Sequence, residues 1–239
     1  METIISYRKR VKLSEFQTLS DRITPLIQQG NLKGAFSVFD EMKIGVNTLN
    51  PKARNFTWWL IEAICDECEE KNHIAKVHYL NFFKQFINNG LEINHKDRYN
   101  ITALNWAVFF HQPEVCEILL EKGASPDIPD DSGRTPLDYA IELFYEEKYG
   151  YFPQTDTSSE IIMSDIMKLL LKYGADPYRP YPSPNTISPL KRDWLFMENF
   201  DEPFTSPIDR LRREAPLLGY ETNPEDEPRL KIVLTGVVE

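Results

Sequence analysis

Apolar residues between positions 100 and 127 fall into two stripes, each with the spacing of one buried helix face. The first stripe follows Thr102, a residue type that often begins a helix. The second follows Pro113, which the first turn of a helix tolerates, and it ends before Gly123, which suits a left-handed helix end. The pattern predicts a turn, a helix, a second helix and a loop. The apolar positions are Leu104, Ala107, Val108, Val115, Ile118, Leu119 and Leu120.

This unit recurs along the chain. Leu137 stands 33 residues after Leu104, and three other pairs have the same spacing: Thr102 with Thr135, Ala107 with Ala140, and Gly90 with Gly123. A constant interval of this length is typical of helix pairs that stack on one another and bury a continuous core. The repeat therefore predicts an all-α stack.

Two intervals depart from this period. Gly123 and Gly174 are 51 residues apart, which predicts an insertion near residues 146–159, where the residue types favour turns. Leu60 and Leu104 are 44 residues apart. This second excess predicts lengthened helices in the preceding repeat, with residues 58–63 opening it and residues 83–90 closing it.

The two ends are less regular. Residues 14–29 have the pattern of a helix, and the apolar stripe over 35–42 predicts a divergent first repeat that caps the stack. The stripe also resembles a pentatricopeptide helix pair, which would imply RNA binding. Beyond Asp176 the prolines exclude a helix interior. We divide the chain into a helical cap (1–50), repeats (51–185) and a Pro-rich cap and tail (186–239), whose end is either a docked strand or a disordered tail.

Composition restricts the class of partner. Hydrophobic residues make up 41% of the 239 residues, enough for a core, and a net charge of −10 disfavours nucleic acid. No apolar stretch approaches the roughly 20 residues of a membrane span, and the first residues lack a signal peptide. Three cysteines do not make a disulfide framework. We expect a cytoplasmic protein that is monomeric when unbound.

The repeat motifs resemble those of ankyrin repeats. Residues 100–107 (NITALNWA) and 133–140 (GRTPLDYA) match the family's G-x-T-P-L-H-x-A opening, and residues 119–124 and 170–176 match its L-L-x-x-G-A-D closing. The resemblance implies an all-α, ankyrin-repeat α-solenoid of about four to five helix pairs with irregular capping ends. It also implies a non-catalytic module that binds a protein partner.

The resemblance further implies which residues meet that partner. In the family, the turn before the first helix and the exposed positions near that helix's end line a concave face. Two adjacent phenylalanines, 109 and 110, cannot both point inward, since successive helix residues are about 100° apart. The aromatics of the insertion would extend this wall. The candidate partner-binding residues are Arg98, Tyr99, Ile101, Phe109, Phe110, Asp131, Ser132, Arg134, Glu142, Tyr145, Tyr149 and Tyr151.

Neither a catalytic nor a metal site is predicted. The chain lacks the short motifs of hydrolases, P-loop enzymes and zinc proteases. Cys65, Cys68, His73 and His78 have the spacing of a zinc knuckle. However, they lie in a glycine-free helical stretch, on which four such ligands cannot converge without a break. We therefore expect no enzyme, no cofactor and no metal.

The last 20 residues combine an acidic stretch with an apolar end. This composition resembles ankyrin-containing effectors that intracellular bacteria deliver through a type IV secretion system, which implies a eukaryotic host protein as the partner. Two alternatives remain open. One is an adaptor that recruits a client through residues 206–220, and the other is an enzyme whose site lies in the C-terminal third.

Overall fold

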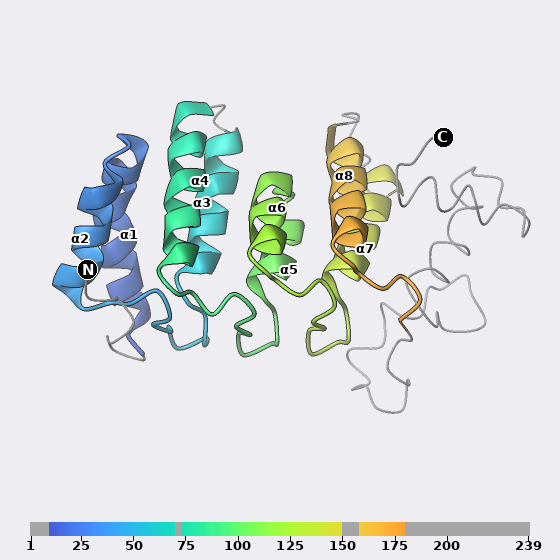
Figure 1. Ribbon diagram of the computed structural model, residues 1–239, viewed down its shortest axis with the longest axis horizontal. Helices are drawn as coiled ribbons and strands as arrows, with labels where there is room; N and C mark the ends of the chain where they lie inside the picture. The colour runs from blue at the N-terminus through green and yellow to red at the C-terminus, as the bar shows by residue number, and fades with distance from the viewer. Residues whose placement is uncertain (1–9, 70–72, 150–157, 180–239) are drawn as a thin grey trace, which may run out of the picture. The chain divides into compact units, whose positions relative to one another are not determined.

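The computed structural model describes residues 10–69, 73–149 and 158–179 (Figure 1). These residues form eight helices and, apart from one isolated bridge between Arg10 and Leu49, no β-pairing. The all-α prediction is therefore confirmed. The chain divides into two compact units, residues 1–124 and 125–239, which we describe separately.

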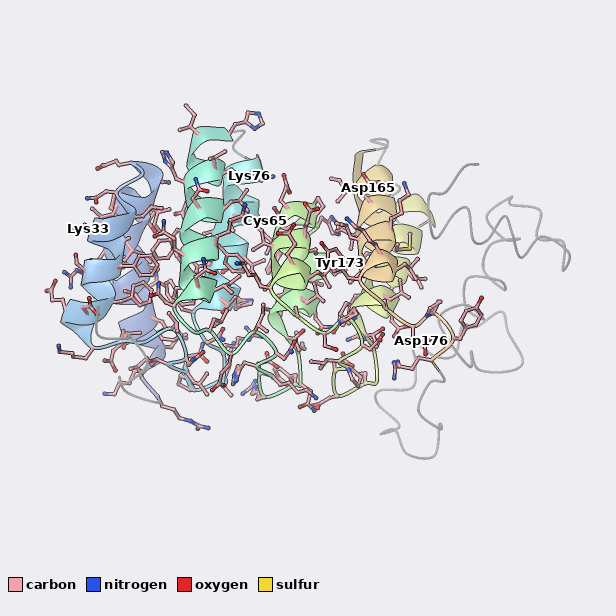
Figure 2. The ribbon with its side chains drawn as sticks, viewed as in Figure 1. Lys33, Cys65, Lys76, Asp165, Tyr173 and Asp176 are labelled. Carbon is pink, nitrogen blue, oxygen red and sulfur yellow. The ribbon has the colours of Figure 1, made fainter. Side chains whose placement is uncertain are left out.

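The first unit contains three helix pairs that stack side by side. Each pair consists of consecutive helices, and neighbouring pairs meet through α1 with α4 and α3 with α5 (Figure 1). Lys76 on α4 adds a link to the third pair, since its Nζ donates to Glu114 Oε1 at 2.6 Å (Figure 2). The helices are α1 (Leu13–Gln28), α2 (Leu32–Met42), α3 (Thr57–Glu69), α4 (His73–Asn88), α5 (Ala103–Phe109) and α6 (Pro113–Glu121).

Aromatic side chains join the first helix pair to the second. Phe39 on α2 is fully buried, and its ring centroid lies 5.5 Å from that of Phe56 and 5.6 Å from that of Phe86. The apolar stripe over 35–42 is thus the packing face of α2. Such contacts between large rings bury much apolar surface and favour edge-to-face geometry.

A five-residue turn appears three times and sets the register of the repeats. In each copy the first residue's backbone N–H donates to the carbonyl of the fifth, over Asn50–Arg54, Asp97–Ile101 and Asp130–Arg134. The first two copies are 47 residues apart and the last two are 33 apart. The 44-residue alignment of Leu60 with Leu104 is therefore wrong. The turn at Asn50 lacks the opening aspartate and the following threonine that mark both later copies, so the sequence concealed it.

Helix ends follow the sequence more closely. Thr102 caps α5 by accepting a hydrogen bond from the Asn105 N–H, and Pro113 opens α6. Gly123 has a φ of 89°, and the Ala124 N–H donates to the Leu119 carbonyl at 2.9 Å. This is the left-handed end that the glycine predicted.

The second unit contains one described helix pair, α7 (Pro136–Tyr149) and α8 (Ser158–Lys172), which pack together. Within the predicted insertion, residues 146–149 continue α7 and residues 158–159 begin α8. The sequence of residues 146–149, Glu-Glu-Lys-Tyr, contains no helix breaker before Gly150. The remaining insertion residues, 150–157, and the Pro-rich cap and tail predicted for 186–239 lie outside the described residues.

Within the described ranges, no helix combines the length and apolar character needed to cross a bilayer.

Candidate protein-binding site

The turn before α5 displays two of the predicted binding residues. Asp97 Oδ1 accepts the backbone N–H groups of Tyr99 at 2.8 Å and Ile101 at 3.0 Å, which closes the turn around its own side chain. Tyr99 is consequently pushed outward and is 41% exposed. The guanidinium of Arg98 lies over the Tyr99 ring, 4.5 Å from its centroid. Ile101 is half-buried beneath them.

At the other end of α5 the two adjacent phenylalanines behave differently. Phe109 is 47% exposed, as expected for one of the two. Phe110 is half-buried and stacks on Trp106, with ring centroids 5.9 Å apart and planes inclined by 27°. Phe109 contacts the same indole edge-on at 5.8 Å. Trp106 therefore supports both rings.

A second indole extends this surface onto α3. Trp58 lies edge-on to Trp106 with centroids 6.2 Å apart. The guanidinium of Arg54 lies over both rings, at 4.9 Å and 4.6 Å from their centroids. Arg54 Nε also donates to Asp97 Oδ2 at 3.0 Å. This arrangement places one cation against two indole faces, a favourable cation–π geometry.

Three buried polar atoms in this region have no hydrogen-bond partner among the described residues: Thr57 Oγ1, Trp58 Nε1 and Trp106 Nε1. All three residues line one small pocket of about 20 Å³, partly open to solvent, between α3, α5 and the segment before α5. Unpaired buried donors of this kind are uncommon in folded proteins and give a bound molecule something to satisfy.

Glu62 occupies the position on α3 that Phe109 occupies on α5. Each residue follows the first residue of its turn by twelve positions, as Glu142 does in the second unit. Glu62 also lies one helical turn after Trp58, on the same face of α3. Burial raises the pKa of Glu62, the negative charge of Asp66 raises it further, and Arg54 lowers it.

We use the name aromatic face for the surface of the first unit formed by Trp58, Glu62, Trp106, Phe109 and Phe110. Sequence reasoning found the two phenylalanines and missed the other three residues and Arg54. With the second repeat aligned at 44 residues, Cys65 took the place that belongs to Glu62. The composition of the turns, with Asn50 where the later copies have aspartate, was the signal that could have corrected this alignment.

The comparisons with known proteins agree with this geometry. A family model described as ankyrin repeats, in three copies, matches residues 72–153. The helix pairs of this region are ankyrin repeats. The predicted fold class is thereby confirmed.

Three curated relatives match parts of the chain. The chain is 28% identical over 116 residues to the E3 ubiquitin-protein ligase hecd-1 of Caenorhabditis elegans, which covers 48% of the chain and 4% of the relative. It is 33% identical over 64 residues to an ankyrin and IPT/TIG repeat-containing protein of Schizosaccharomyces pombe, a match that covers 25% of the chain and 6% of the relative. It is 42% identical over 50 residues to NF-kappa-B inhibitor alpha of Sus scrofa, a match that covers 21% of the chain and 16% of the relative. The chain spans only a small part of each relative's length.

In the second unit two of the candidate partner-binding residues, Arg134 and Glu142, contact one another. Arg134 donates to Asp130 Oδ2 at 3.1 Å, to Glu142 Oε2 at 3.3 Å and to the Tyr139 hydroxyl at 3.0 Å. Arg134 and Glu142 therefore hold the turn against α7. Asp131 is exposed and Ser132 is half-buried.

The remaining aromatic candidates stay predictions. Tyr145 and Tyr149 lie on α7, but their side chains are outside the described residues, as is the whole of Tyr151.

One of the four zinc-knuckle residues, His78, has a packing role. His78 Nδ1 lies 3.0 Å from the Gln28 carbonyl, and its ring lies against Gly30, so it packs on the end of α1. Cys65 lies on α3 and His73 begins α4 (Figure 2). Among the side chains that the structure describes, no group of three potential ligands could hold a metal ion.

Proposed function

We propose that this ankyrin repeat protein is a non-catalytic binding module whose aromatic face holds a protein partner. Ankyrin repeats are protein-interaction modules, and partner binding is their usual role. The observation that carries the choice of surface is the support of Phe109 by Trp106, with nearly half of the Phe109 ring open to solvent. Large rigid aromatics that protrude from a packed base are typical anchors of protein interfaces.

The turn before α5 extends this surface. Tyr99 and Arg98 are both exposed and lie against one another, so they already hold a defined shape. A preformed surface loses little conformational entropy on binding, which favours affinity. We therefore expect a partner to bind with little change in the repeats.

The relatives support a role within larger assemblies. One is an E3 ubiquitin-protein ligase by name and another is an NF-kappa-B inhibitor, and the matched segment is 4% of the first and 16% of the second. The activities of these whole proteins do not transfer to the chain. The adaptor alternative keeps this support, because a short ankyrin segment within a much longer chain suits the selection of a client.

We also propose a cytoplasmic location and, on the strength of the composition of the last 20 residues, delivery into a host cell by a type IV system. A translocation reporter fused to the chain should enter host cells in a manner that requires both the secretion system and residues 220–239. Entry that persists without these residues would contradict delivery.

The binding function is tested by comparing two exposed apolar residues. Phe109 belongs to the aromatic face, while Val77 lies on α4, is 53% exposed and serves as the matched control. We expect Phe109→Ala to lose a partner captured from eukaryotic cytosol that the wild-type chain and Val77→Ala retain, at unchanged melting temperature. Equal loss with both variants would assign capture to general stickiness.

A further inference from the structure

The aromatic face has a carboxylate and an exposed aromatic ring at equivalent positions of neighbouring helices. Glu62 on α3 and Phe109 on α5 each lie twelve residues after the start of the preceding turn, and α3 packs directly on α5. Trp58, one turn before Glu62, contacts Trp106, one turn before Phe109. The two pairs of residues therefore lie at successive levels of the same two helices, about one turn or roughly 5 Å apart.

The level of Trp58 and Trp106, which we call the lower level, already holds a guanidinium. Arg54 lies over Trp58 and Trp106, and its Nε donates to the Asp97 carboxylate, which is almost fully buried. The positive charge of Arg54 is thus matched within the protein. An aromatic residue and a carboxylate recur one turn higher, as Phe109, which is 47% exposed, and Glu62, which is half-buried.

A second carboxylate lies near Glu62 at the upper level. Asp66 lies one turn beyond Glu62 on α3, and the effect of its negative charge on Glu62 is greater than the opposing effect of Arg54. The half-buried carboxylate of Glu62 therefore lies in a negative field. A cation bound from outside would relieve this repulsion and would also lie against the Phe109 ring.

We propose that Glu62 and Phe109 form a subsite for the side chain of an arginine or lysine residue of the protein partner. This inference rests on the proposed binding function and specifies the chemistry of its partner. The cation would pair with the Glu62 carboxylate, and its apolar stem would cover the Phe109 ring.

Other occupants fit this surface less well. An apolar segment would enclose the Glu62 carboxylate without a partner, which is costly. An acidic segment would meet Glu62, Asp66 and a chain of net charge −10. A positive side chain is the occupant that satisfies both the ring and the charge.

The test uses a charged probe and its neutral isostere. N-acetyl-arginine methylamide and N-acetyl-citrulline methylamide have nearly the same shape, but only the first is positively charged. Both are titrated into the full chain, and the indole N–H signals of Trp58 and Trp106 are followed by ¹H–¹⁵N NMR. We expect the arginine compound to cause saturable shifts at these two signals, and the citrulline compound to cause none.

Two variants of equal charge separate the subsite from the general acidity of the chain. Glu62→Gln removes the carboxylate of the subsite, while Glu117→Gln removes an exposed carboxylate from α6. We expect Glu62→Gln to weaken binding of the arginine compound about fivefold, and Glu117→Gln to leave it unchanged. Equal responses to the two probes, or equal weakening by the two variants, would overturn the subsite.

A third outcome bears on the partner itself. A captured partner that requires Phe109 but binds equally well to Glu62→Gln would contradict the cation subsite and leave the proposed binding function intact. Failure to capture any partner through Phe109, with the probe results as expected, would instead count against the binding function.

Discussion

Arg54 and Asp97 join two consecutive turns of the stack through an ion pair of 3.0 Å. The two residues are 43 positions apart in the chain, and their side chains are only 11% and 3% exposed. Asp97 also accepts the backbone N–H groups of its own turn, and Arg54 lies against two indoles. This ion pair therefore connects the two turns with the indoles of α3 and α5, which form the base of the aromatic face.

The first prediction concerns this pair. Replacing Arg54 with alanine leaves the Asp97 carboxylate buried without its cation, and it also removes the cation between the indoles. We expect Arg54→Ala to lower the free energy of unfolding by about 3 kcal/mol, measured by urea denaturation.

The control is an ion pair of the same chemistry at the surface. Arg22 pairs with Glu41 at 2.6 Å, but both side chains are well exposed. Arg22→Ala should therefore leave stability unchanged within error, since solvent screens such pairs. A similar loss in both variants would show that the buried pair has no special role.

A second prediction concerns the turn that the sequence concealed. Ala53 has a φ of 56°, whereas the equivalent position of the last turn is Gly133, with a φ of 87°. A left-handed conformation costs alanine roughly 1–2 kcal/mol, and glycine loses part of this gain through a more flexible unfolded chain. We expect Ala53→Gly to raise the free energy of unfolding by about 0.5–1 kcal/mol.

Asn100, with a φ of 59°, provides the comparison. Asparagine tolerates this conformation better than alanine does, so Asn100→Gly should gain less. Thermal unfolding of the two variants measures the difference. A loss of stability in Ala53→Gly would show that the turn does not strain the alanine.

These turns also explain how far the sequence could predict the fold. The helix pair over 102–121 was predictable because Thr102, Pro113 and Gly123 each begin or end a helix in the structure as their residue types indicate. The second repeat was predictable as a pair of long helices but not in register. Its turn is closed by the side chain of Asn50, whose Oδ1 accepts the backbone N–H groups of Lys52 and Arg54 where the later turns use aspartate. This substitution hid the equivalence in the sequence.

The aromatic face was predictable only in part. Two adjacent phenylalanines on one helix require one exposed ring, and geometry alone gives that result. The pairing of Arg54 with Asp97 and the packing of Trp58 on Trp106 depend on contacts between repeats, which no local pattern reveals. The equivalence of Glu62 with Phe109 became visible only when the hydrogen bonds of the turns had fixed the register of the repeats.

A third prediction is the pH dependence of stability from Glu62. Because burial and Asp66 raise its pKa above the ordinary 4.5, the folded chain holds this proton more tightly than the unfolded chain. The resulting stabilisation is complete at low pH and is lost as the pH rises through the raised pKa. Glu62→Gln removes the cost of ionisation, so this variant should melt above the wild type at pH 7.

The advantage of Glu62→Gln should disappear as the pH falls below about 4, where the wild-type carboxyl is protonated in both states. Arg54, which lowers the pKa of Glu62, and Asp66, which raises it, are present in both the wild type and Glu62→Gln. Glu117→Gln should show no such crossover. An advantage that grows on acidification would contradict the raised pKa and, with it, the negative field around Glu62.

The last prediction separates anchoring from packing at the two ends of α5. Tyr99 projects from its turn, so Tyr99→Ala should leave the melting temperature almost unchanged. Phe110 stacks on Trp106, and its loss would open a space beside the indole. Phe110→Ala should therefore cost about 2 kcal/mol of stability in addition to any loss of binding. Calorimetry of the two single variants measures this. If Phe110→Ala melted like the wild type, the stacked ring would contribute to binding alone, and the base of the aromatic face would have to be redrawn without it.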